Sequence, residues 1–269
     1  MTSSLTTVID QPPSGRSRAV MLDSHDYAQQ VLLQGRPVPW HEPMAFSNFF
    51  GQAQALLKSD VALLSLDRLY DHLLQTNARL TSSLSAKTRT GYALRTLLAD
   101  PEAISYVTEL ATVFSKTQRS PIVLQLPSPM QWLTRTHHFA GTTDAATLDA
   151  DDADNASMYV ADWLRSFAAL GLAGVLLDDR TPAGGVEPVP VGLDSYSPIA
   201  NVTEHYGWTL GLRRDEGITL HGAGAAGGII RSEFWLESDH PLPEGDFLLG
   251  EIPPAAVPEE VLTRILSME

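Results

Sequence analysis

The sequence predicts an α/β fold in which parallel strands alternate with helices. The clearest unit spans residues 155–182, where apolar side chains first recur at helical spacing and then stop at a glycine. A uniformly apolar run at 174–177 follows, which is typical of a strand buried on both faces of a parallel sheet, and it ends at Asp178. Two further runs, 120–127 and 246–251, also have the length of buried strands. A chain of 269 residues suits one α/β barrel, and two smaller domains also fit.

The composition is that of a globular protein with an acidic surface. Hydrophobic residues make up 43% and charged residues 19% of the chain. The formal net charge of -14 repels phosphate backbones and anionic membranes, so neither nucleic acid nor membrane is expected as a partner. No apolar run approaches the roughly 18 residues that cross a bilayer, and no secretory signal is recognisable, so a cytoplasmic protein is expected. The absence of cysteine excludes disulfides, thiolate nucleophiles and Cys-ligated metals.

The first third of the chain is predicted to be mainly helical. Residues 1–18 carry few apolar side chains and are expected to form a flexible N-terminal arm, whereas 19–269 form a single α/β domain. A short strand at 19–22 is followed by a helix that Asp23 or Ser24 caps and that ends near Gly35. From Asp60 onward, apolar spacing predicts a buried helical stripe made of Leu63, Leu66, Tyr70, Leu73 and Leu74.

The remaining elements alternate more regularly. The sequence Asp100-Pro101-Glu102 is a strong helix start, because it combines a cap, a proline and an acidic first turn. Segment 180–198 contains several prolines and glycines without any period, so it is expected to be a long loop that shields a site. Further strands are expected at 206–212, at 217–220 and, with or without a short helix, at 228–236, and a last helix is expected from Pro258.

Three segments together carry a family resemblance. They are Ser120–Met130 (SPIVLQLPSPM), Asp162–Pro182 and Phe247–Leu266 (FLLGEIPPAAVPEEVLTRIL). They resemble strands, acidic strand ends and following helices of the superfamily of uroporphyrinogen decarboxylase and cobalamin-independent methionine synthase. The resemblance implies a single (β/α)8 TIM-type barrel, complete or irregular, with its site at the C-terminal ends of the strands. Methyltransferases of this superfamily bind zinc through His and Cys, so a chain without cysteine is predicted to be a divergent member without thiolate-bound zinc.

Polar residues at the ends of the predicted strands are the candidate site residues. The predicted catalytic residues, which act as acid or base or bind an amine, are Asp178 and Glu251. The predicted substrate-binding residues are Gln125, Ser128, Asp179 and Arg213. Among them the arginine is expected to anchor a carboxylate. Capping of local turns is the alternative for the aspartates, the glutamine and the serine, and a solvated surface position is the alternative for the arginine.

Two other patterns bear on cofactors. Segment Gly222–Gly227 matches GxGxxG, the dinucleotide fingerprint, but few residues follow it and a flexible glycine loop is the preferred interpretation. His137 and His138 are adjacent, whereas two metal ligands on one helix face need a spacing of three or four. This pair therefore predicts no metal site. A site that combines His41 or His221 with Asp178 or Glu251 stays open, and the cofactor is not identified.

These observations favour an enzyme that acts on a small polar organic substrate. The resemblance implies lyase or group-transfer chemistry, with methyl transfer as one option. The first alternative is a non-catalytic relative that binds a ligand or partner, and the second is a nicotinamide-dependent enzyme that uses the glycine loop. The sequence leaves the oligomeric state open, a homo-oligomer included.

Overall fold

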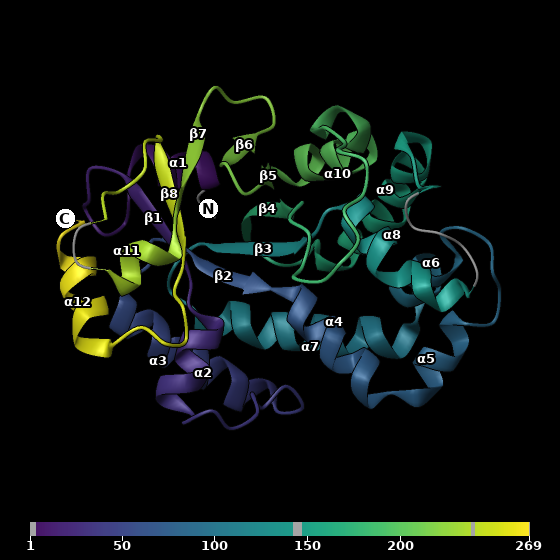
Figure 1. The fold of residues 1–269 in the computed structure, drawn as a ribbon, viewed down its shortest axis with the longest axis horizontal. Coiled ribbons are helices and arrows are strands. Elements are labelled where there is room, and N and C mark those ends of the chain that lie inside the picture. The colour runs from purple at the N-terminus through teal and green to yellow at the C-terminus, as the bar shows by residue number, and fades with distance from the viewer. Residues whose placement is uncertain (1–3, 142–146, 238–239, 269) are drawn as a thin grey trace.

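The chain forms a nearly closed barrel of eight strands surrounded by helices (Figure 1). The computed structural model describes residues 4–141, 147–237 and 240–268. In the sheet the strands follow the order β1-β8-β7-β6-β5-β4-β3-β2. They are β1 (Ala19–Asp23), β2 (Ala62–Ser65), β3 (Ile122–Pro127), β4 (Leu172–Asp178), β5 (Thr209–Arg213), β6 (Ile218–Leu220), β7 (Ala226–Ile230) and β8 (Phe247–Glu251). The predicted fold class, an irregular (β/α)8-type barrel, is confirmed.

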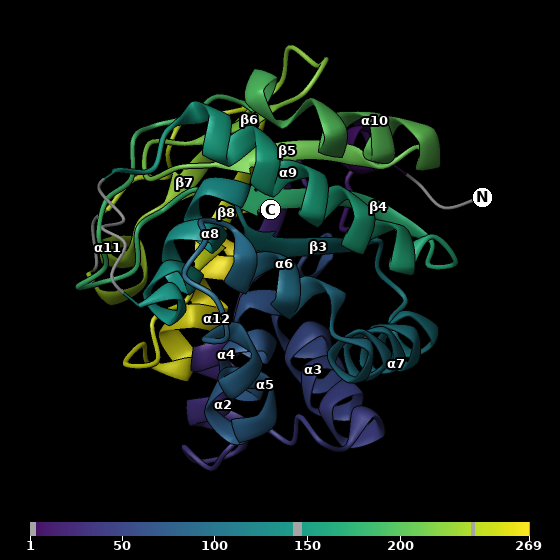
Figure 2. The same cartoon turned by 90° about the vertical axis from the view of Figure 1, so that its right-hand side faces the viewer.

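Helices cover most of the outside of the barrel (Figures 1 and 2). They are α1 (Leu5–Asp10), α2 (His25–Leu32), α3 (Pro43–Leu57), α4 (Leu66–Thr76), α5 (Ala78–Leu84), α6 (Tyr92–Ala99), α7 (Pro101–Thr117), α8 (Pro129–His137), α9 (Ala150–Leu164), α10 (Ser197–Tyr206), α11 (Ser232–Leu236) and α12 (Pro258–Leu266), with short 3₁₀ turns η1 (His138–Ala140), η3 (Arg165–Phe167) and η4 (Leu193–Tyr196). Outward side chains of β2 to β5 pack against α3 to α10, and those of β1, β7 and β8 pack mainly against α11 and α12. In the part of the chain that the structure describes, no helix is both long and apolar enough to traverse a bilayer.

The barrel departs from regular βα alternation at one place. Strand β6 runs antiparallel to both β5 and β7, so a hairpin occupies the position where a helix would connect two parallel strands. This hairpin lies at the top of Figure 1. The segment Gly222–Gly227 forms its turn and the start of β7. A dinucleotide fingerprint needs a strand followed directly by a helix, and this local context is different.

The barrel closes at the seam between β1 and β2 through hydrogen bonds of Ser59 and Asp60. These strands stand at the two ends of the strand order, and bonds from the segment before β2 join them. The N–H of Val20 donates to Oδ2 of Asp60 at 2.8 Å, and the N–H of Leu22 donates to Oγ of Ser59 at 3.0 Å. The N–H of Asp60 in turn donates to the carbonyl of Val20 at 2.9 Å. The seam therefore satisfies backbone groups that an open sheet edge would leave unpaired.

The N-terminal arm contains a helix that closes the bottom of the barrel. Ser4 caps α1 by accepting the N–H of Thr7, and the apolar face of the helix is buried, with Leu5 and Val8 each 1% exposed. Both side chains belong to the cluster of inward residues, which includes Met21, Leu176 and Phe247. The few apolar side chains of residues 1–18 predict no buried partner for this arm. The sequence does not predict this helix, because six residues are too few to show a helical period. A helix this short is stabilised mainly by tertiary packing.

Truncating the buried leucine of this helix tests how firmly it is docked. Leu5→Ala is expected to lower the free energy of unfolding by about 2–4 kcal/mol, because it removes methyl groups from a packed interior. The matched control is Leu266→Ala at a leucine that is 57% exposed, where a change within about 0.5 kcal/mol is expected. Urea denaturation measures both values. Equal, small effects of the two substitutions would mean that the arm is not docked in the barrel and is flexible, as the sequence predicts.

Several predicted boundaries are wrong. The stripe predicted as one helix from Asp60 divides into strand β2 and helix α4, which follow each other without an intervening loop. Helix α9 begins earlier than predicted, because Asp149 and Asp152 form a capping box ahead of it. The end of segment 180–198, which was predicted as a loop, contains the 3₁₀ turn η4, and helix α10 begins directly after that turn. The predicted start of α7 is confirmed, since Asp100 accepts the N–H of Ala103 at 2.9 Å.

Candidate functional site

Six strands present polar side chains to the barrel interior at their C-terminal ends. Each of these residues lies two positions after an inward-facing residue, which is apolar in five strands and a glycine in β5. Because side chains alternate between the two faces of a strand, the polar residues also point into the barrel. The register pairs Asp23 with Glu251, Ser65 with Gln125, and Asp178 with Arg213 across neighbouring strands. We call this set the polar layer; its members are Asp23, Ser65, Gln125, Asp178, Arg213 and Glu251.

Arg213 joins three strands of the polar layer. Its side chain is 1% exposed. Nη1 donates to Oε1 of Gln125 at 3.2 Å, and Nη2 donates to Oε2 of Glu251 at 3.0 Å. Nη1 also lies 3.8 Å from Oδ2 of Asp178. A buried guanidinium needs such compensation, and here it connects β5 with β3, β4 and β8.

Arg180 covers the layer from the loop after β4. Its Nε and Nη2 donate to the two carboxylate oxygens of Asp178 at 2.9 and 2.8 Å, and Nη1 donates to Oε2 of Glu251 at 3.0 Å. Burial acts to raise the pKa of Asp178, but the hydrogen bonds from Arg180 and the charges of Arg213 and Arg180 outweigh it. The pKa of Asp178 is therefore lowered, and its carboxylate is ionised at neutral pH.

Arg68, in the first turn of α4, holds the opposite side of the layer. Nη1 donates to Oδ2 of Asp23 at 2.9 Å, and Nη2 donates to Oδ2 of Asp26 at 3.1 Å. Burial again acts to raise the pKa of Asp23, and Arg68 more than offsets it, so that pKa lies well below its usual range. Nη2 of Arg68 is 4.0 Å from Oε1 of Glu251, so this oxygen has no hydrogen bond of ordinary length from Arg68.

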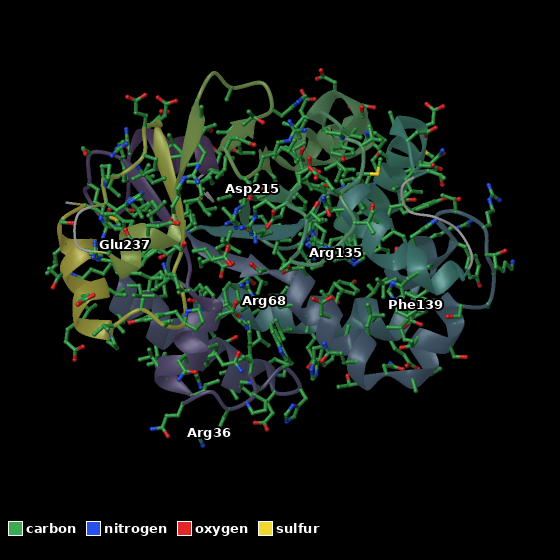
Figure 3. All side chains as sticks on the ribbon, viewed as in Figure 1. Arg36, Arg68, Arg135, Phe139, Asp215 and Glu237 are labelled. Carbon is green, nitrogen blue, oxygen red and sulfur yellow. The ribbon has the colours of Figure 1, made fainter. Side chains whose placement is uncertain are left out.

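The polar layer opens into a cavity of about 520 Å³, which we call the mouth cavity. Figure 3 shows Arg68, Arg135 and Asp215, which come from α4, α8 and the segment after β5, around the middle of this face. Six carboxylates and three guanidiniums line the cavity, and they belong to Asp23, Asp67, Asp71, Asp178, Asp215, Glu251, Arg68, Arg135 and Arg180. The mouth cavity thus lies where α/β barrels carry their chemistry and has an excess of negative charge.

The structure brings only part of the predicted site together. Asp178, Glu251 and Gln125 line the mouth cavity. Arg213 lies beneath it as a buried support and does not line it.

The other two predicted binding residues face away from the mouth cavity. Asp179 accepts bonds from Oγ of Ser128 at 2.5 Å and from Nε of Arg214 at 3.2 Å, and it borders a neighbouring cavity of about 520 Å³ behind the 180–190 segment. Burial raises the pKa of Asp179 beyond what its partners Ser128 and Arg214 offset. Ser128 is fully buried and caps α8 by accepting the N–H of Gln131. Both residues therefore hold the β3–α8 turn against the end of β4.

Sequence reasoning missed most of the charged residues of the mouth. Asp23 follows an apolar run as Asp178 does, so the same rule identifies it, but it was interpreted as a helix cap. Arg68 and its neighbour Asp67 were assigned to the middle of a long helix, whereas they lie just after a strand end. Arg135 has no local signal, because its position depends on how α8 packs against α4.

The residues of the mouth do not resemble a metal centre. Among residues 4–141, 147–237 and 240–268, no group of three or more His, Asp or Glu side chains is arranged to hold a metal ion. The chain matches no protein-family model, no curated protein and no solved structure. The function must therefore be inferred from the geometry of the mouth cavity.

Proposed function

We propose that this protein is an enzyme that acts on a small polar organic molecule in the mouth cavity. The observation that carries the proposal is that four of the six polar-layer residues, Asp23, Gln125, Asp178 and Glu251, come from four strand ends and line one cavity of about 520 Å³. Active sites of barrel enzymes lie at this end of the strands, and the volume suits a small molecule. The resemblance to the methionine synthase and uroporphyrinogen decarboxylase superfamily favours lyase or group-transfer chemistry, here without a thiolate-bound zinc.

The ion pairs suggest different roles for Asp178 and Glu251. Asp178 stays ionised and fixes the guanidinium of Arg180 in one orientation, so its role is to position that charge. Arg213 supports Glu251 from below. Glu251 is the carboxylate of this pair whose Oε1 faces the cavity without a short ion pair, and its side chain is 39% exposed. Glu251 is thus the group best placed to transfer a proton or to bind an amine.

Turnover of a metabolite panel by the wild type and a Glu251→Gln variant tests the proposal. The panel contains small amines, amino acids and organic acids, and mass spectrometry follows their consumption. We expect one class to be consumed and kcat to fall by about 10²–10⁴-fold in Glu251→Gln, the range typical of losing a general acid or base. The control is Glu109→Gln on the exposed surface of α7, which changes the net charge equally and should leave kcat unchanged.

The same experiment separates the enzyme from the non-catalytic alternative. Ligand-induced thermal stabilisation without consumption of any compound would identify a binding protein. Full turnover by a folded Glu251→Gln variant would instead remove Glu251 from the mechanism.

A further inference from the structure

A second cavity of about 370 Å³ lies directly beside the mouth cavity. Its walls are largely aromatic and aliphatic and include Tyr70, Leu74, Pro127, Trp132 and Phe139. We call it the tail cavity. It shares three lining residues with the mouth cavity, namely Asp67, Asp71 and Arg135. In Figure 3, Arg135 lies between Arg68 at the mouth and Phe139 in the tail cavity.

The boundary between the two cavities consists of a loose ion pair. Nη1 of Arg135 is 3.7 Å from Oδ2 of Asp67, which is too long for a hydrogen bond. Oδ1 of Asp67 and Nε of Arg135 are buried without a hydrogen-bond partner in the part of the chain that the structure describes. Burial raises the pKa of Asp67 more than the charges of Arg68 and Arg135 lower it. Unmet polar atoms at a boundary between two cavities are typical of a site that a ligand completes.

The charges of the mouth cavity select the sign of the ligand. Its lining contains six carboxylates against three guanidiniums, and Arg213 adds a fourth guanidinium beneath the cavity, which still leaves an excess of carboxylates. Arg68 and Arg180 already donate to carboxylates at 2.8–3.1 Å, so their charges are largely compensated. Asp71 and Asp215 form no ion pair with any residue that the structure describes. The remaining field is negative and favours a cation.

We propose that the two cavities together take one organic amine with an apolar extension. Its ammonium group binds in the mouth cavity near Asp71, Asp215 and Glu251, and its apolar part lies against Tyr70 and Trp132 in the tail cavity. This assignment rests on the proposed function, because it names the substrate class of the same site. It also explains why an apolar cavity opens beside a strongly charged one.

Calorimetric titration with three simple probes tests the assignment on the intact protein. The probes are propylamine, 3-phenylpropylamine and 3-phenylpropanoate. We expect 3-phenylpropylamine to bind about 10–100-fold more tightly than propylamine, as burial of a phenyl group predicts. We expect no measurable binding of 3-phenylpropanoate, because its charge has the wrong sign.

Filling the tail cavity provides the matched variant. Leu74→Trp should reduce the affinity for 3-phenylpropylamine to that for propylamine and leave propylamine binding unchanged. Gln75→Trp, at an exposed position that lines the same cavity, repeats the test if Leu74→Trp does not fold. The control is Leu56→Trp on α3, outside both cavities, where all affinities should equal those of the wild type.

The outcomes separate this inference from the proposed function. Equal affinities for the two amines, or tighter binding of 3-phenylpropanoate, overturn the inference. Consumption of an anionic metabolite that needs Glu251 would overturn it too, while the proposed function would stand. Selective binding of 3-phenylpropylamine that Leu74→Trp abolishes supports the inference, even if no compound in the panel is turned over.

Discussion

Replacing Arg213 by Met is expected to lower the free energy of unfolding by about 3–5 kcal/mol. The guanidinium is 1% exposed and donates to Glu251 at 3.0 Å and to Gln125 at 3.2 Å, with Asp178 at 3.8 Å. Methionine has a similar length but no charge, so the substitution removes compensation from Asp178 and Glu251 and leaves the amide oxygen of Gln125 without its donor. The loss should therefore exceed that of an ordinary surface substitution.

Two further variants show whether geometry or charge is responsible. Arg213→Lys keeps the charge but cannot reach two partners with a planar fork, so an intermediate loss is expected. Arg119→Met alters an exposed arginine and should change the free energy of unfolding by no more than about 0.5 kcal/mol. Guanidinium chloride denaturation at constant pH gives all three values. If Arg213→Met were as stable as Arg119→Met, the polar layer would not depend on its central arginine.

Asp60→Ala is expected to destabilise the protein by about 3–5 kcal/mol through the β1–β2 seam. Asp60 is 1% exposed and accepts the N–H of Val20 at 2.8 Å and the N–H of Ser14 at 2.8 Å. Its Oδ2 also lies 3.5 Å from Nη1 of Arg16, whose side chain is 2% exposed. Alanine leaves the buried guanidinium of Arg16 without its carboxylate and the N–H of Val20 without an acceptor. Burying such groups without a partner costs free energy, because water cannot reach them freely.

An exposed aspartate with a single backbone hydrogen bond provides the comparison. Asp246 also accepts one backbone N–H, that of Ala226 at 2.8 Å, but it is exposed. Asp246→Ala should therefore be clearly less destabilising than Asp60→Ala, at about 1 kcal/mol. Hydrogen exchange adds a local measurement, since the amide of Val20 should lose protection in Asp60→Ala. Unchanged exchange at Val20 would show that the seam closes without this side chain.

Local patterns predicted three residues that line the mouth cavity, namely Gln125, Asp178 and Glu251. Asp178 and Glu251 were recognised because each ends a short apolar run, and parallel strands bring their C-terminal ends to one rim. In the structure Arg180 and Arg213 both donate to Glu251, and Arg180 donates to both oxygens of Asp178, so the two carboxylates share one polar layer. Their catalytic role stays a prediction until turnover is measured.

The errors have specific physical reasons. Strand β2 is four residues long and runs directly into α4. Its apolar residues fit the helical spacing of α4, so the strand was predicted as part of the helix. An aspartate between a strand and a helix can cap the helix or contribute to a site at the end of the strand. For Asp23 the sequence is compatible with both roles. Arg213 was recognised at the correct end of its strand, but the burial of its side chain depends on the closure of the whole barrel.

By itself the sequence determined that buried strands alternate with helices and that several of these strands end in charged residues. Those properties depend on neighbours along the chain, through backbone geometry and the spacing of apolar side chains. Only the tertiary structure decided which charges pair, as between Arg213 and Glu251 or Arg68 and Asp23, and that an apolar cavity opens beside them. Hydrogen bonds and ion pairs act over a few ångströms, so their partners are set by the closure of the barrel and not by separation along the sequence.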